Sequence, residues 1–149
     1  MAHPAWGRAA VKLVRIRALA IAALLLLAPS GAIAAVSPSY SYYDIGKVTA
    51  PRPAPTQQGL LLVGGGAWDN DAFRWFVEKA GHGHIVVIAA SGDTEENDAF
   101  YREIGGVTSV ETIVFHDRAA AFDQRVLGIL RRADGIFISG GDQSNYVRY

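Results

Sequence analysis

The sequence predicts an α/β fold in which a parallel sheet carries helices on both faces. Short, continuous apolar runs recur between residues 59 and 139, and segments with apolar residues at helical spacing separate them. The runs lack the polar alternation of a strand with one face in water, so each is expected to be buried on both faces. Strands that alternate with helices in this way are parallel, and ligands bind beyond their carboxyl ends.

Four strands are expected, each ending close to glycine or to a polar loop. They are residues 59–63, 85–90, 110–115 and 135–139. Three glycines, Gly64 to Gly66, follow the first strand, and Gly140 and Gly141 follow the last. The second run is rich in β-branched residues, which favour strands.

Three helices are expected between these strands, over residues 71–80, about 98–104 and 119–133. Gly81 supplies a stop for the first of them. The third is the clearest, because four apolar residues recur there at helical spacing: Phe122, Val126, Ile129 and Leu130. Asp142 or Ser144 is suited to cap a further helix at the end of the chain.

Residues 1–34 have the pattern of a secretory signal peptide. Residues 1–17 carry four basic and no acidic side chains, residues 18–28 are apolar, and Ala32-Ile33-Ala34 is a small-x-small cleavage site. The apolar run is about half the roughly 20 residues that a membrane-spanning helix needs. Cleavage after Ala34 or Ala35 is therefore favoured over an uncleaved anchor. No Arg-Arg pair precedes the run, so we expect the general secretory route, a periplasmic or extracellular location, and no stable membrane insertion after cleavage.

Residues 35–58 are rich in proline, serine and tyrosine and are expected to form a linker without regular structure. The folded domain is expected over residues 59–149. Four of the 14 basic residues lie in the signal, so residues 35–149 hold 10 basic and 14 acidic side chains, a net charge of −4. This balance argues against a nucleic-acid partner. The chain has no cysteine, which excludes disulfides and a thiol nucleophile.

The glycines after the first expected strand are weaker pocket candidates: Gly65, Gly66 and, nearby, Asp69. Consecutive glycines let a backbone turn sharply and approach a ligand closely. A dinucleotide fingerprint would need a glycine where Asp69 stands, so nucleotide binding is disfavoured and no cofactor is expected. A purely structural tight turn stays open as the alternative.

The most informative segment is Gly140-Gly141-Asp142-Gln143, directly after the last expected strand. The two glycines offer backbone N–H groups that no side chain obstructs, which is the material of an oxyanion hole. Gln143 adds a neutral donor and acceptor for orienting an amide or a carboxylate. The alternative is a simple turn in which Asp142 only caps the next helix.

The remaining polar residues give weaker signals. His82 and His84 have a spacing that can chelate a metal, but they lie away from the expected site, and no metal is expected. His116 and Asp117 follow the third strand, but adjacent side chains generally point apart. Ser91 lacks the G-x-S-x-G frame of a nucleophile elbow and is expected to be a loop or capping residue. Four acidic residues are expected to form a solvated helix start: Asp93, Glu95, Glu96 and Asp98.

Taken in order, these pieces resemble the cyanophycinase and dipeptidase E family of serine peptidases. The resemblance covers about residues 59–149. It includes the strand into Gly64-Gly65-Gly66, the Ala-Ser end of the second strand and Phe100-Tyr101, and it is strongest over 133–143, Ala-Asp-Gly-Ile-Phe-Ile-Ser-Gly-Gly-Asp-Gln. It implies the flavodoxin-like α/β fold of class I glutamine amidotransferases. In that family a serine on a strand-to-helix turn attacks the peptide carbonyl and a histidine acts as base.

The resemblance also implies a substrate and roles for the site. Gly140 and Gly141 would supply the oxyanion hole or adjacent backbone, and Gln143 would hold the substrate. That substrate would be a cyanophycin-like β-aspartyl-arginine peptide or an aspartyl peptide. No partner other than this peptide is implied, although a homodimer stays open.

The catalytic residues of the family have no match in this sequence. Their Gly-Thr-Ser-Ala-Gly type turn comes one strand after Gly-Gly-Asp-Gln, and the sequence ends at Tyr149. We therefore expect a peptidase domain truncated after about four strands, a hydrolase by family and inactive by itself. The alternatives are a non-catalytic peptide-binding module and an amidotransferase-like protein of the same fold.

Overall fold

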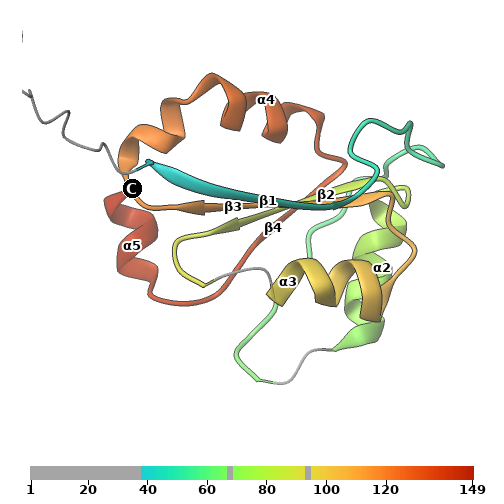
Figure 1. Ribbon diagram of the computed structural model, residues 1–149. Helices are drawn as coiled ribbons and strands as arrows, with labels where there is room; N and C mark the ends of the chain where they lie inside the picture. The colour runs from blue at the N-terminus through green and yellow to red at the C-terminus, as the bar shows by residue number, and fades with distance from the viewer. Residues whose placement is uncertain (1–37, 67–68, 93–94) are drawn as a thin grey trace, which may run out of the picture. The chain divides into compact units, whose positions relative to one another are not determined.

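The computed structural model describes residues 38–66, 69–92 and 95–149. A four-stranded sheet lies at the centre of the fold that these residues form (Figure 1). The expected signal peptide, residues 1–34, lies outside them. The sheet has the order β1-β3-β2-β4. Its strands are Tyr40–Gly46 (β1), His84–Ala89 (β2), Ser109–Phe115 (β3) and Gly135–Ile138 (β4). β2 pairs in parallel with β3 and β4, whereas β1 is antiparallel to β3. The α/β class is confirmed, and the sheet is mixed rather than wholly parallel.

Strand β1 lies in the segment that was expected to be an unstructured linker. Tyr42 pairs with Ile113 of β3, and its ring packs against the apolar cluster on that face of the sheet. Ile45 contributes to the cluster on the opposite face. The chain beyond β1 is also fixed, because Ala54 N–H donates to Gly81 O at 3.1 Å. The serine-tyrosine alternation was the available signal, since aromatic residues favour strands.

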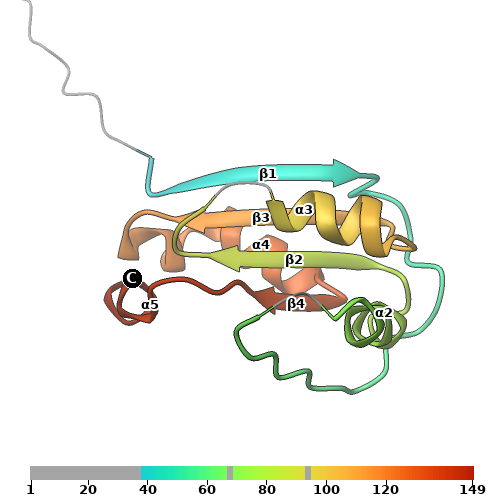
Figure 2. The ribbon, with the colours of Figure 1, turned by 90° about the horizontal axis from the view of Figure 1, so that it is seen from below.

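The strand expected at residues 59–63 is absent, and that prediction was wrong. Leu60 and Leu62 are 79% and 84% exposed, and Leu61 packs against the core. β4 pairs directly with β2, and the segment runs past the β4 edge of the sheet (Figure 2). An apolar run forms a strand only where a neighbouring backbone meets its N–H and C=O groups. Here Gln57 N–H donates to Lys79 O at 2.8 Å, which ties the start of the segment to a helix instead.

Helices cover both faces of the sheet, as expected. They are α2 (Asn70–Lys79), α3 (Glu95–Asp98), the π-helical segment η2 (Ala99–Ile104), the 3₁₀ turn η3 (Arg118–Phe122), α4 (Gln124–Arg132) and α5 (Gln143–Arg148). α4 lies on one face, and α2 and α3 lie on the other (Figure 1). None of the helices in the described ranges is long and apolar enough to cross a membrane.

The third expected helix, residues 119–133, is divided at Asp123. This residue has an extended backbone, and its carboxylate caps α4 by accepting from Arg125 N–H and Val126 N–H. Such capping ends one helical segment and starts another. Phe122, which was expected on the apolar face, is therefore turned outward and is 67% exposed.

The core is divided by the sheet into two clusters. On the side of α2 and η2, Phe100 is fully buried and makes edge contacts with Phe73 and Phe137 at ring-centroid distances of 5.5 and 5.3 Å. On the side of α4, Val86 and Ile113 pack against the helix. Strand β2 contributes to both clusters, so its burial on both faces is confirmed.

Candidate functional site

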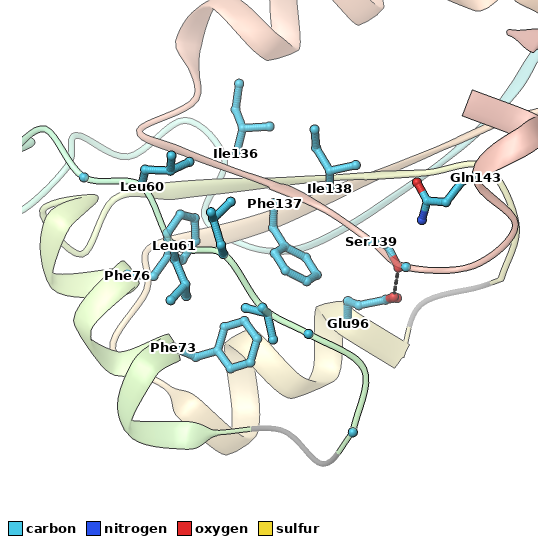
Figure 3. Close-up of a pocket in the computed structure, with 16 residues that line it drawn as sticks. Leu60, Leu61, Phe73, Phe76, Glu96, Ile136, Phe137, Ile138, Ser139 and Gln143 are labelled. Atoms are coloured by element: carbon cyan, nitrogen blue, oxygen red, sulfur yellow. Dashed lines mark hydrogen bonds between the residues drawn. The ribbon is translucent and has the colours of Figure 1, made fainter. Parts of the chain in front are cut away.

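A hollow of about 660 Å³ lies between β4 and the segment that follows Gly59 (Figure 3). Its wall is mainly apolar, with Leu61 and Phe73 on one side and Ile138 on the other. Its polar end is formed by Glu96 of α3, Ser139 and Gly140 after β4, and Gln143 at the start of α5. This end lies at the carboxyl ends of β2 and β4, where ligands of parallel sheets bind.

The glycine pair Gly140-Gly141 follows β4, and Gly140 lines this end of the hollow. Ser139 N–H donates to Ile88 O at 2.9 Å, which extends the pairing of β4 by one residue. Gly141 then has φ +111°, a conformation that favours glycine, and a Cβ there would lie 3.0 Å from Ser91 Oγ. Within the described part of the chain, the N–H groups of Gly140 and Gly141 have no hydrogen-bond acceptor.

Asp142 and Gln143 have different surroundings although they are adjacent. The carboxylate of Asp142 accepts from Ser144 N–H at 2.9 Å and caps α5, and hydrogen bonds from Ser144 lower its pKa. Within the described ranges, the exposed side chain of Gln143 makes a single long contact, 3.4 Å from Nε2 to Gly141 O. Its amide therefore keeps donors and an acceptor for a ligand in the hollow, whereas Asp142 serves the helix.

Three polar side chains that the sequence did not assign to the site connect its parts. Ser139 Oγ donates to the half-buried Glu96 carboxylate (Figure 3). Tyr146 OH lies 2.8 Å from Ser139 O and 3.3 Å from Ile88 O, so α5 is joined to the ends of both strands. Burial raises the pKa of Tyr146, and the nearby charge of Glu96 adds to this shift.

Glu96 lies at the start of a helix, as expected, but its side chain is half-buried rather than fully solvated. Asn97, the next residue, is buried and accepts a hydrogen bond from Thr112 of β3, which holds α3 against the sheet. Glu96 precedes Asn97 in α3, and its carboxylate accepts from Ser139 Oγ. No local sequence signal distinguishes Glu96 from the other acidic residues of its segment, because the contact joins residues 43 positions apart.

The first glycine cluster contributes less to the hollow. Gly64 and Gly66 line it, and Gly66 has φ +138°. Gly65 is exposed. Asp69 caps α2, because its carboxylate accepts from the N–H groups of Asp71 and Ala72 at 3.1 and 3.2 Å.

Two serine-histidine hydrogen bonds occur among the residues with a described structure, and neither pair lines the hollow. Ser41 Oγ lies 2.8 Å from His116 Nε2, and Asp117 caps η3 instead of orienting this histidine. The ring of His84 is held between Ser109 Oγ, at 2.7 Å, and a backbone carbonyl. Neither pair has the third, orienting carboxylate of a catalytic triad among the residues described.

The described ranges contain no group of three or more histidine, cysteine or carboxylate side chains placed to hold a metal ion. His82, which the sequence spacing paired with His84 as a possible metal chelate, has φ +57°. Its Nδ1 lies 2.9 Å from Gly106 O, so the ring is engaged by the backbone of the next turn.

Comparison with known proteins points to one family. The chain is 35% identical over 97 residues to cyanophycinases of Synechococcus elongatus and Thermosynechococcus vestitus, which covers 58% of this chain and 30% of each relative. The chain thus spans less than a third of the length of these curated relatives. No family model and no solved structure matches it. The sequence therefore has a distant, partial similarity to cyanophycinases, at the level of the family.

Proposed function

We propose that residues 59–149 are the substrate-holding part of an exported, cyanophycinase-like serine peptidase domain that acts on β-aspartyl-arginine or aspartyl peptides. The observation that carries the proposal is the pair of N–H donors of Gly140 and Gly141, which have no acceptor among the described residues, next to the exposed and weakly engaged amide of Gln143. Together they offer a peptide carbonyl two donors and a peptide amide one acceptor. The partial similarity to cyanophycinases supports the same choice of substrate.

The 149-residue chain is proposed to bind such a peptide without cleaving it. No residue of the sequence matches the serine turn or the histidine base that the family resemblance calls for. Ser139, the buried serine at the hollow, donates to a carboxylate rather than to a histidine. A partial oxyanion hole without a nucleophile stabilises no covalent intermediate, so turnover is not expected.

The test is a titration of the isotope-labelled chain with a β-aspartyl-arginine dipeptide, followed by NMR. The amides of Gly140 and Gly141 and the side-chain NH₂ of Gln143 are expected to shift together, and Gln143→Ala is expected to weaken binding about tenfold. Unchanged spectra up to millimolar peptide would refute the holding role. Release of aspartate and arginine that persists through repurification would refute the proposed inactivity.

A further inference from the structure

The hollow beside β4 joins an apolar wall to a single acidic end. Leu62, Phe73 and Ile138 belong to the wall, and Glu96 is the acidic side chain of the lining. A ligand group with an aliphatic stem and a terminal positive charge would fit an apolar wall with one acidic end. Such side chains pack their methylenes on apolar surface and keep the charge beside a polar group.

The charge of Glu96 is not neutralised by the described part of the protein. One carboxylate oxygen accepts from Ser139 Oγ. The ion pairs in the described part of the protein use other carboxylates, those of Asp71, Asp98, Glu111 and Asp134. The second oxygen of Glu96 has no hydrogen-bond partner among the residues that the structure describes, so the acidic end keeps both a net charge and a free acceptor there.

The position of Glu96 relative to the peptide-holding groups is also fixed. Ser139 links it to the loop that carries Gly140, Gly141 and Gln143. A peptide held by those groups would therefore have its neighbouring side chain beside the apolar wall and the acidic end.

We propose that Glu96 binds the cationic side chain of the peptide substrate and determines its preference for arginine. This inference rests on the proposed function of the same hollow. A guanidinium group presents several N–H donors in a planar fork, so it can donate to the free carboxylate oxygen while Ser139 retains the other. An ammonium group carries the same charge but lacks this geometry, and lysine is expected to bind more weakly.

The experiment compares two ligands of equal shape on the full chain by isothermal titration calorimetry. They are Nα-acetyl-arginine amide and Nα-acetyl-citrulline amide, which differs from arginine in lacking the positive charge. Arginine is expected to bind about tenfold more tightly than citrulline. Glu96→Gln is expected to abolish this preference, whereas Glu103→Gln, which removes an equal charge from an exposed position outside the hollow, retains it.

A second variant separates cation binding from a purely structural link. Ser139→Ala breaks the same hydrogen bond but leaves the Glu96 carboxylate, so the arginine preference should persist. Loss of the preference in both variants, or its survival in Glu96→Gln, would overturn the inference. If both ligands bind equally well, and Gln143→Ala weakens the binding of both, only the role of Glu96 is overturned. If neither ligand binds, the proposed function is overturned as well.

Discussion

Replacing Arg132 with methionine is expected to destabilise the domain by about 3 kcal/mol, because it removes the cation that a buried carboxylate contacts. Glu111 lies in the middle of β3, and its side chain is fully buried. One oxygen accepts from Arg132 and, at 2.8 Å, from Tyr42 OH. The other oxygen is buried without a hydrogen-bond partner among the described residues. Without Arg132, the carboxylate would keep a single neutral donor.

The magnitude follows from the unequal exposure of the two partners. Leaving one member of a buried ion pair uncompensated costs about 3–5 kcal/mol. Arg132 is 44% exposed, so solvent already screens part of the attraction, and the lower end of that range applies. For a folded part of roughly 100 residues, about 3 kcal/mol corresponds to a decrease of roughly 12 °C in Tm.

Chemical denaturation and thermal unfolding of matched variants measure this effect. Arg131→Met is the control, since Arg131 is exposed, lies in the same last turn of α4 and carries the same charge. It is expected to change stability by no more than about 0.5 kcal/mol. The double variant Glu111→Leu with Arg132→Met removes both charges and is expected to recover most of the loss. Equal effects of the two single variants would refute the reasoning.

Two further predictions concern the strained loop and the tyrosine beside Glu111. Gly141→Ala is expected to destabilise the domain by about 1–2 kcal/mol, because φ is +111° and the new Cβ would lie 3.0 Å from Ser91 Oγ. Gly140→Ala is the control, because a Cβ at Gly140 has no atom within 4 Å. If chemical denaturation shows that both variants lose the same stability, strain at Gly141 is contradicted. Burial, and then the bond and charge of Glu111, raise the pKa of Tyr42 above its ordinary value of 10.0. A raised phenol pKa stabilises the fold below pH 10 and loses this contribution as the pH rises further. The free energy of unfolding should therefore fall less steeply above pH 10 in Tyr42→Phe than in the wild type. The same dependence on pH in both proteins would contradict the raised pKa of Tyr42.

The α/β class could be predicted because it depends on patterns that act over short distances. The runs at 85–90, 110–115 and 135–139 became β2, β3 and β4 with shifts of one residue at their ends. Glycine and capping residues also act locally, so Gly81 ends the turn after α2 with φ +60°, and Asp142 caps α5. Each of these outcomes needs only the residue and its immediate neighbours.

The two strand errors have one physical origin. An apolar run and a serine-tyrosine run differ in hydrophobicity, but a strand exists only where another backbone is in register with it. β3 offers such an edge to Tyr40–Gly46, and seven residues of each strand pair there. Leu60 and its neighbours are held by a helix at their start, and β4 is already paired with β2 on its inner edge. Sequence pattern therefore predicted how apolar each segment is, but not which edge it reaches.

The site divides in the same way. The sequence by itself determined that Gly140, Gly141 and Gln143 follow the end of a strand in an α/β sheet, because glycine after an apolar run is a local signal and ligands bind beyond strand ends. Only the tertiary structure decided that Glu96, Ser139 and Tyr146 share the site. These contacts join α3, β4 and α5 across the sheet. Their existence depends on how the elements pack, which the order of residues along the chain does not record.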